Sequence, residues 1–167
     1  IVQDAKKKGA KVVVIDSYKS RTAKQADWHL SPKPGTDGAL AMAIINHIIS
    51  NDLTDKDYID KYTDGFEELK SHVSDKTPEW ASKITGVNKE DIEKLAFELA
   101  KNQPAAIRIG VALERHHGGG QTIRAVTCIP GLTGAWKHVG GGITQFPVWE
   151  HPYKFDVICR PDLIPEG

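Results

Sequence analysis

The stretch KVVVIDSYKSRTAKQADWHLSPKPGTD, residues 11–37, decides the fold class of this chain. Its β-branched run, 11–15, is continuous rather than alternating, which is typical of a strand covered on both faces in a parallel sheet. The run ends in Asp16, and a second acid, Asp37, stands at the start of an apolar helix. An α/β fold presents carboxylates to a nucleotide in this manner, at the carboxyl edge of its sheet.

Helix signals surround this stretch on both sides. The chain opens within a helix that ends at Lys8, and Gly9 then suits a left-handed C-cap. Residues 37–50 carry apolar side chains at helical spacing and predict a long helix. Cap residues predict four more: one after Thr54 or Asp55, one over 65–73, one from Thr77 to Gly86, and one from Asn88 to the break at 102–104.

Strand signals are fewer. Residues 26–30 are a candidate for a second short strand, and 105–111 have the composition of another buried strand. A helix is predicted over 121–132, with its end obscured by Pro130, and the glycine-rich segment 134–146 is predicted to be a loop. Together these spacings predict a single α/β domain over residues 1–167, a three-layer sandwich with a mostly parallel, Rossmann-like sheet.

Composition argues against several classes of function. The 167 residues include 22 basic and 22 acidic side chains, so no basic excess indicates a nucleic-acid surface. The longest apolar run is far shorter than the roughly 20 residues of a membrane helix, so no membrane contact is expected. Cys128 and Cys159 form no CxxC pair, and Cys128 is expected to be a buried, inert thiol. Because the first residue is not Met and lies in mid-helix, we expect a fragment of a longer protein.

The loop after the first strand is the first candidate site. The Asp16 carboxylate can accept hydrogen bonds from a ribose diol or a base edge, or it can begin the turn through contacts with its own backbone. Ser17, Tyr18, Lys19 and Ser20 suit phosphate or ribose contacts, although an ordinary polar loop has the same composition.

The second candidate site is Gly35, Thr36 and Asp37. Either Thr36 or Asp37 can cap the helix that follows. Asp37 can alternatively read guanine, because one carboxylate can accept both N–H donors at N1 and N2 of that base. The two roles are compatible if Thr36 caps the helix and Asp37 reads the base.

The third candidate site is VALERHHGGG, 111–120. Its glycines allow close approach to a ligand, while Arg115 and His116 supply donors for phosphate or other ligand oxygens. No metal site is expected, because the adjacent His116 and His117 point in different directions and no third ligand stands at a zinc-type spacing.

The chain has no GxGxxG after a strand and no GxxxxGK[ST], GxSxG or HExxH motif, so no catalytic residue is predicted. The tryptophans are expected to serve packing: Trp28, Trp80, Trp136 and Trp149.

In five segments, taken in order, the chain resembles the molybdopterin oxidoreductases of the dimethyl-sulfoxide-reductase superfamily, whose cofactor is bis-molybdopterin guanine dinucleotide. The resemblance covers about residues 5–145. It departs from the family pattern at Ser17 and Tyr18, where Pro-Arg is usual, and at Glu114 and Arg115, where a Gln is common. The segments are VVVIDSYKSRTAKQAD through PGTDGALAMAIINHII (12–49), DYIDKYTDGFEEL (57–69), TPEWASKITGV (77–87), IRIGVALERHHGG (107–119) and AVTCIPGLTGAWKHVGGG (125–142).

This resemblance implies an internal nucleotide-binding domain of a catalytic subunit, which holds the guanosine end of one of two pterin cofactors. The implied contacts are Asp16, Ser17, Tyr18, Lys19, Ser20, Gly35, Thr36 and Asp37. Val111 and Arg115, at and after the end of the strand predicted over 105–111, complete the set. Molybdenum or tungsten, its protein ligand and any iron–sulfur cluster are expected outside this segment. The implied partners are the other domains of the subunit and electron-transfer subunits. The full enzyme would perform two-electron or oxygen-atom transfer, and the fragment alone would be inactive.

Two other hypotheses stay open at this point. One is a stand-alone regulatory α/β module that senses a nucleotide. The other is a structural domain that has lost its cofactor, as in the large subunit of a quinone reductase. The presence of both Asp16 and Asp37 argues against the second of these.

Overall fold

The computed structural model describes residues 2–145 of the chain. The strands are β1 (Val13–Ile15), β2 (Trp28–Leu30), β3 (Ala106–Ile109) and β4 (Gly142–Gln145), and the 3-10 helices are η1 (Val111–Arg115) and η2 (Ala135–Lys137). The α-helices are α1 (Val2–Lys7), α2 (Arg21–Gln25), α3 (Asp37–Ser50), α4 (Lys56–Tyr62), α5 (Phe66–His72), α6 (Pro78–Thr85), α7 (Lys89–Lys101) and α8 (Gly119–Leu132).

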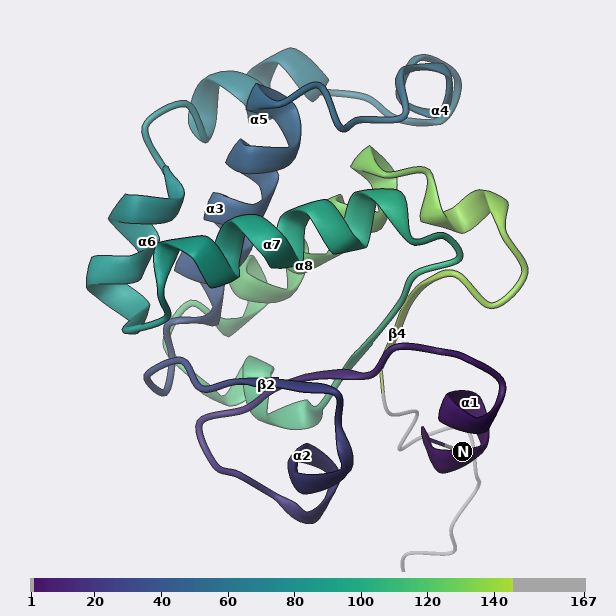
Figure 1. Ribbon diagram of the computed structural model, residues 1–167. Coiled ribbons are helices and arrows are strands. Elements are labelled where there is room, and N and C mark those ends of the chain that lie inside the picture. Colours follow the sequence, from purple (N-terminus) through teal and green to yellow (C-terminus); the bar gives the residue numbers. More distant parts are fainter. Residues whose placement is uncertain (1, 146–167) are drawn as a thin grey trace, which may run out of the picture.

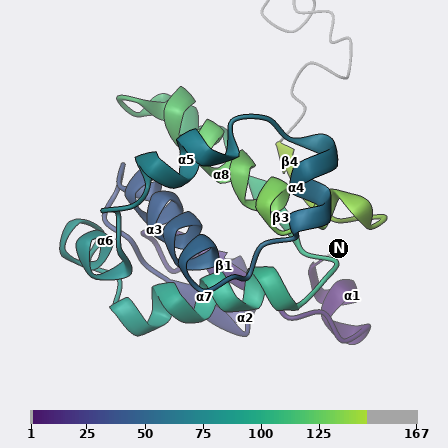
Figure 2. The same cartoon turned by 90° about the horizontal axis from the view of Figure 1, so that it is seen from above.

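The central element of the core is α3. Its sequence is apolar on nearly every side, and Ala43, Ile45 and Ile48 are fully buried. The helix packs against α6, α7 and α8, which surround it when the molecule is seen from above (Figure 2). A helix that is hydrophobic all round must be enclosed by other elements, and here the enclosing elements are other helices.

The described strands form two separate parallel sheets. In the first, β1 pairs with β2, with Val13 opposite Trp28 and Ile15 opposite Leu30. In the second, β3 pairs with β4. A mixed α/β fold with parallel strands is therefore confirmed. Within residues 2–145, however, the two sheets are not joined into the single sheet that the sequence predicts.

The sheet of β1 and β2 lies between helices. Figure 1 shows α2 on one side of β2 and the large helices α3, α7 and α8 on the other. Leu30 is buried in the core, and Val13 and Trp28 pack against it. Lys94 on α7 lies 4.7 Å from the centroid of the Trp28 ring, and this contact ties the helix to the sheet.

The strands differ from their predicted form in three ways. Complete cover of the first strand is wrong, because Ile15 at its carboxyl end is 42% exposed. The third strand ends at Ile109 rather than Val111, which instead begins η1. The segment 134–146, predicted to be a loop, contains η2 and β4. Residues after 145 lie outside the described part of the chain.

Helix boundaries follow the sequence more closely. The long helix covers Asp37–Ser50 as predicted, and residues 28–30 form the second short strand. Gly9 and Gly86 have φ angles of +89° and +77°, which suit the left-handed caps expected of them. Pro130 lies in the last turn of α8 without ending it. No helix within residues 2–145 is long and apolar enough to cross a membrane.

Asn46 provides a test of the core. It is buried on α3, and its Nδ2 donates hydrogen bonds to the backbone oxygens of Val73 (2.8 Å) and Ser74 (3.3 Å). Asn46→Leu keeps a branched side chain, although a larger one, and leaves the Val73 carbonyl without this donor, so we expect it to lower the free energy of unfolding by about 1–3 kcal/mol. Urea denaturation of the 167-residue chain measures this loss. Ser50→Leu, at the exposed end of the same helix, should change stability by less than about 0.5 kcal/mol.

Asp55 joins the start of α4 to the end of α8. Its carboxylate accepts a hydrogen bond from the Tyr58 backbone N–H at 3.0 Å, which caps α4, and forms an ion pair with Lys137. Its own backbone N–H donates to the Leu132 carbonyl at 2.8 Å. The Lys137 ammonium, together with the Tyr58 N–H, holds the pKa of the Asp55 carboxyl below its ordinary value.

Because this pKa is lower in the folded state, the charge of Asp55 stabilises the fold above the unfolded pKa, about 3.9. That contribution should begin to shrink as the pH falls below about 4, and it is lost as the pH falls through the lower pKa of the folded state. Asp55→Ala should cost about 1–2 kcal/mol at pH 7, because it removes the cap as well. Asp55→Asn keeps a good cap residue and should cost less, and its deficit should be smaller at pH 3 than at pH 7. Asp60→Asn, at an exposed position of α4, is the control in chemical denaturation at both pH values. An equal deficit of Asp55→Asn at pH 7 and pH 3 would contradict the charge effect.

Candidate functional site

The first two candidate segments meet beside the sheet of β1 and β2. Because these strands are parallel, their carboxyl ends lie at one edge of the sheet. Ser31 Oγ donates a hydrogen bond to the Ser17 carbonyl at 3.0 Å, and His29 Nε2 donates to the Asp16 carbonyl at 2.8 Å. The loop after β1 is therefore held against the segment that leads from β2 to α3.

Asp16 performs the local role that the sequence allows. Its Oδ1 accepts a hydrogen bond from the Tyr18 backbone N–H at 3.0 Å, which closes the turn after β1. The residue is half-buried, so its carboxyl group is not sealed in the core. A role as ligand for a ribose or a base stays a prediction.

The four residues after Asp16 differ in how much of them is free to bind. Ser17, Tyr18 and Lys19 are exposed, and Tyr18 keeps 71% of its surface in solvent. Ser20 is half-buried, and its Oγ accepts a hydrogen bond from the Ala23 N–H at 3.2 Å as the cap of α2. Any contact of these side chains with a ligand stays a prediction.

The turn before α3 corrects one expectation. Thr36 occupies the N-cap position, but its Oγ1 donates to the Lys33 carbonyl at 2.6 Å and makes no cap hydrogen bond. Asp37 is the first residue of the helix rather than its cap. Neither side chain therefore performs the capping role considered for it. Asp37 is half-buried, and its role as guanine reader stays a prediction.

The third candidate segment reaches the start of α3 through glycine contacts. Gly35 has a φ of +78°, and a Cβ built on it would lie 3.3 Å from His116 Nδ1. A Cβ on Gly38 would lie 3.0 Å from Thr122 Oγ1 on α8. The first turns of α3 and α8 thus lie side by side, with η1 leading into this contact. Val111 is half-buried and Arg115 is exposed, at opposite ends of η1.

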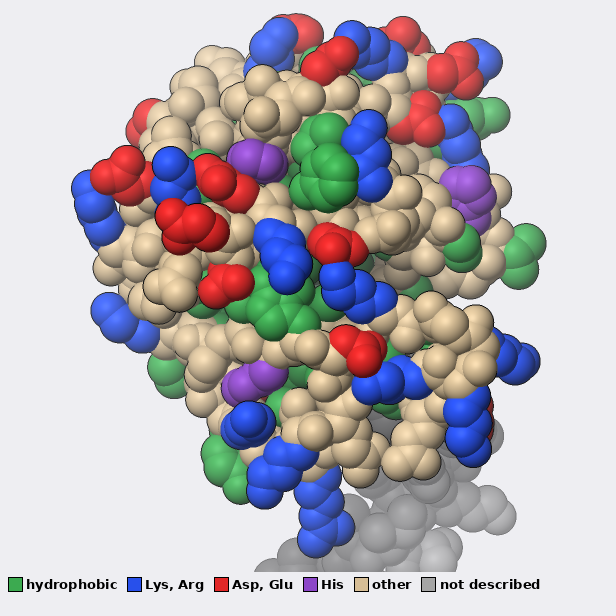
Figure 3. Space-filling model, in the orientation of Figure 1, with side chains coloured by type: hydrophobic (Ala, Val, Ile, Leu, Met, Phe, Trp, Pro, Cys, Tyr) green, Lys and Arg blue, Asp and Glu red, His purple; other side chains and the backbone are tan. Residues whose placement is uncertain are grey.

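The electrostatics of this region favour an anion. Neither α3 nor α8 has a side-chain cap at its amino end, so the positive ends of two long helix dipoles meet here. Figure 3 shows Lys and Arg side chains gathered toward the end of the molecule that carries α2, whereas the upper part mixes both signs. Five nearby basic residues are exposed and make no ion pair within residues 2–145: Lys19, Arg21, Lys24, Lys33 and Arg115.

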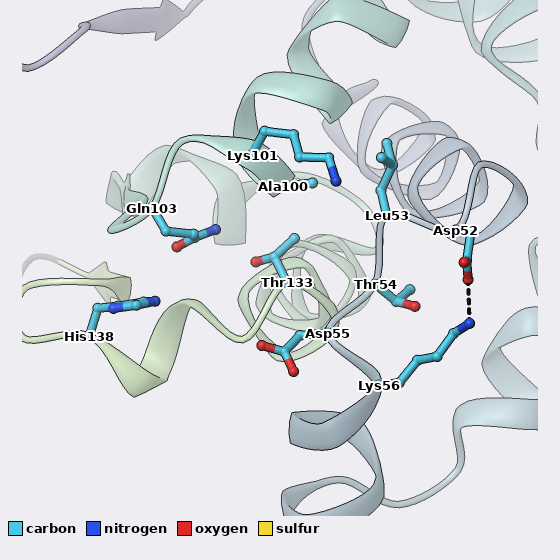
Figure 4. A pocket seen from close by; sticks show the side chains of 10 residues that line it. All are labelled: Asp52, Leu53, Thr54, Asp55, Lys56, Ala100, Lys101, Gln103, Thr133 and His138. Carbon is cyan, nitrogen blue, oxygen red and sulfur yellow. Dashed lines mark ion pairs between the residues drawn. The ribbon is translucent and has the colours of Figure 1, made fainter.

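A cavity of about 440 Å³ lies elsewhere, at the opposite end of α3. It is lined by residues 52–56 and by the segments after α7 and α8 (Figure 4). Since α3 has 14 residues, this end lies about 20 Å from Asp37. The two carboxylates in its lining, Asp52 and Asp55, are already paired with Lys56 and Lys137. The cavity is therefore separate from the candidate site, and its acids are not free for a ligand.

The side chains that could bind a metal, the Cys128 thiol and the tryptophans were the remaining candidates from the sequence. Within residues 2–145, no group of three or more His, Cys, Asp or Glu side chains is arranged to hold a metal ion. Burial raises the pKa of the half-buried Cys128 thiol, which keeps it protonated at neutral pH. Cys159 and Trp149 lie outside the described residues. The packing role expected of the tryptophans is confirmed for Trp28 and Trp80, which contact the core, whereas Trp136 is 44% exposed.

Three contacts of this site were not predicted from the sequence. His29 and Ser31 fasten the loop after β1, and the His116 ring lies against Gly35. The sequence does not indicate which group a serine after a strand will hydrogen-bond. The Pro34-Gly35 pair does indicate a turn, but it does not indicate which side chain covers that turn.

Comparisons with known proteins show which proteins this chain is similar to. Residues 1–151 match the family model described as molybdopterin oxidoreductase. The chain is 43% identical to "Probable oxidoreductase YoaE" of Bacillus subtilis over 98% of its own length and 24% of that protein. It is 39% identical to the "F420-dependent formate dehydrogenase subunit alpha" of Methanocaldococcus jannaschii, over 85% of its length and 21% of that protein.

A solved structure agrees in fold as well as in sequence. The chain superimposes on the acetylene hydratase of Pelobacter acetylenicus with a TM-score of 0.79 and 33% identity. The match covers 84% of this chain and 19% of the hydratase chain. The chain thus spans about a quarter or less of the length of these relatives.

Gly35→Ala tests the geometry of the turn before α3. The left-handed φ of Gly35 costs other residues about 1–2 kcal/mol, and the new methyl group would also press on the His116 ring. We therefore expect a loss of stability of at least this size, measured by urea denaturation. Gly110→Ala is the matched control, since a Cβ there meets no atom within 4 Å and its φ is −92°. Equal stability of Gly35→Ala and Gly110→Ala would show that the turn does not have this geometry.

Proposed function

The chain belongs to the molybdopterin oxidoreductase family, and we propose that it binds the guanine-dinucleotide end of a molybdopterin cofactor. The observation that carries this proposal is the convergence of three segments: the loop after β1, the turn before α3, and the segment from η1 into α8. These segments contain all ten residues predicted to contact the cofactor: Asp16, Ser17, Tyr18, Lys19, Ser20, Gly35, Thr36, Asp37, Val111 and Arg115.

The pyrophosphate of the dinucleotide is assigned to the amino ends of α3 and α8. Backbone N–H groups and helix dipoles there favour a negative ligand, and no side chain caps either helix. Arg115 is exposed shortly before the start of α8 and supplies positive charge, whereas the side chain of Lys33 lies against Gly86 after α6. A dianionic pyrophosphate matches this surface better than a neutral ligand would.

Asp37 is assigned to the base. A carboxylate offers two acceptors side by side, and guanine presents two adjacent donors at N1 and N2. Adenine presents an acceptor at N1, so the same carboxylate would repel it. Asp16 is assigned to the ribose or to the base edge, through the oxygen that does not close the turn with Tyr18.

The contribution of this chain to catalysis is then positioning. When bound, the pterin carries molybdenum or tungsten, which supplies two-electron or oxygen-atom transfer. The residues of this chain would hold the distant nucleotide so that the pterin is correctly placed. The metal ligand, any iron–sulfur cluster and the substrate site are assigned to other parts of the parent protein, and the 167-residue chain alone should be inactive.

We assign the parent protein to the molybdenum- or tungsten-dependent oxidoreductases, as the catalytic subunit. Its other domains and electron-transfer subunits are the partners we propose, because relatives include a chain named as the alpha subunit of a formate dehydrogenase. The reaction itself is not assigned, since a structural neighbour of the same fold is named a hydratase.

The finer fold is also part of the proposal. The sheet of β1 and β2 has α2 on one face and the helical core on the other, which is a local version of three layers. Both two-stranded sheets have unpaired edges within the described residues. We assign residues 1–167 to one α/β domain. Strands from the rest of the parent protein would complete its three-layer, Rossmann-like sandwich.

Asp37→Asn tests the assignment of the base. The amide replaces one acceptor by a donor, so one of the two hydrogen bonds to guanine is lost and a donor faces a donor. In the cofactor-free full-length protein, we expect the affinity for GMP to fall about tenfold to a hundredfold, as measured by calorimetry. Binding of AMP should be weak in both proteins. Asp60→Asn, exposed on α4, is the control.

The result also separates the alternatives. A wild-type preference for AMP, or GMP binding unaffected by Asp37→Asn, would contradict the guanine-reader role. A purified parent protein that contains no pterin and no molybdenum or tungsten would favour a structural domain that has lost its cofactor.

A further inference from the structure

The turn that presents Asp37 is fastened from the side of α6. The Lys33 backbone N–H donates a hydrogen bond to the Thr85 carbonyl at 2.8 Å. The Lys33 carbonyl in turn accepts from the N–H of Thr36 at 3.2 Å and from its Oγ1 at 2.6 Å. These bonds fix the base of the turn, but none of them involves Gly35 at its tip.

A histidine from a distant part of the chain lies beside the tip of the turn, and both residues stay exposed to solvent. Three atoms of the His116 ring lie near the position of a Cβ on Gly35: Nδ1 at 3.3 Å, Cγ at 3.7 Å and Cε1 at 3.9 Å. These distances place the Nδ1 side of the ring beside the face of Gly35 from which a side chain would project. The histidine is itself anchored, because its carbonyl accepts the Gly119 N–H at 2.9 Å where α8 begins. The backbone that carries the ring is thus held at the start of a long helix.

We propose that His116 is a positioning residue, whose ring holds the turn before α3 so that both carboxylate oxygens of Asp37 face guanine. Glycine has no side chain to restrict its own backbone, and its φ of +78° is one of several accessible to it. The His116 ring removes that freedom two residues before the base reader. Discrimination of guanine would then depend on a residue that does not touch the base. The inference rests on the proposed function, since it needs Asp37 to read guanine.

A competing role for His116 makes a different prediction. If the imidazole binds a phosphate directly, its removal lowers the affinity for every nucleotide that carries the phosphate by the same factor. If the ring acts by packing, its removal mainly lowers the affinity that comes from the contact between Asp37 and the base. GMP and IMP distinguish the two roles, because IMP has the same phosphate and N1–H but lacks the N2 amino group.

The experiment measures GMP and IMP binding to the cofactor-free full-length protein by calorimetry. The wild type should prefer GMP, and His116→Ala should reduce the ratio of GMP to IMP affinity about tenfold. His116→Phe should restore most of that ratio, because a phenyl ring can pack on Gly35 but cannot hydrogen-bond a phosphate. His117→Ala, in the neighbouring exposed residue that is not among the atoms nearest to Gly35, should leave the ratio unchanged. The thermal unfolding midpoint of each variant shows whether it is folded.

Each outcome bears on a definite claim. Equal losses of GMP and IMP affinity in His116→Ala, without rescue by His116→Phe, would overturn the packing role and indicate a phosphate contact. An unchanged ratio in His116→Ala, together with a ratio abolished by Asp37→Asn, would overturn this inference and leave the proposed function standing. A wild type that shows no preference for GMP over IMP or AMP would overturn both.

Discussion

The packing of α3 against α8 is the constraint on which the rest of the structure depends. The two helices are the longest in the described part of the chain, and α3 contributes more of the buried core residues than any other element. At their amino ends the helices can approach closely, because Gly38 faces Thr122 with no side chain between. This approach brings the turn before α3 next to the segment that leads into α8. The candidate site is therefore a consequence of how the core is packed.

The sequence predicts the helices well, because helix signals are local. The apolar spacing of DGALAMAIINHII specifies α3 without reference to its partners. The capping side chains of Asp55 and Thr77 and the left-handed Gly86 mark boundaries that agree with the structure. Each of these signals acts within one helical turn, so no knowledge of distant contacts is needed to recognise it.

The strands show where such local reasoning fails. β4 lies in a glycine-rich segment that has no strand composition, and it forms because Ala106 to Ile109 pair with it across 36 residues. Val111 continues an apolar run but lies in η1, since the chain must turn toward α8 immediately after β3. Ile15 is exposed at the last position of a strand that has only three residues and pairs with β2. Pairing partners, rather than composition, decide these segments.

The same distinction applies to the site. The sequence predicts Asp16 as a candidate because it follows a strand, and Asp37 because it stands at the start of a helix. In the structure both residues occupy these positions and are half-buried. The cap expected of Thr36 is absent because its hydroxyl finds a nearer acceptor, the Lys33 carbonyl. The contact of His116 with Gly35 joins residues 81 positions apart, and only the packing of α8 on α3 brings them together.

The direction of the helices gives the chain two unlike ends. The amino ends of α3 and α8 meet beside unpaired basic residues, which is the electrostatic setting for an anion. The carboxyl ends of α3, α7 and α8 lie near the cavity lined by Asp52, Lys56 and Lys101, where basic side chains complement negative helix ends. At that end each lining acid already has its own lysine, so the charges are balanced within the chain. At the other end the positive charge is left in excess, and a bound pyrophosphate would balance it.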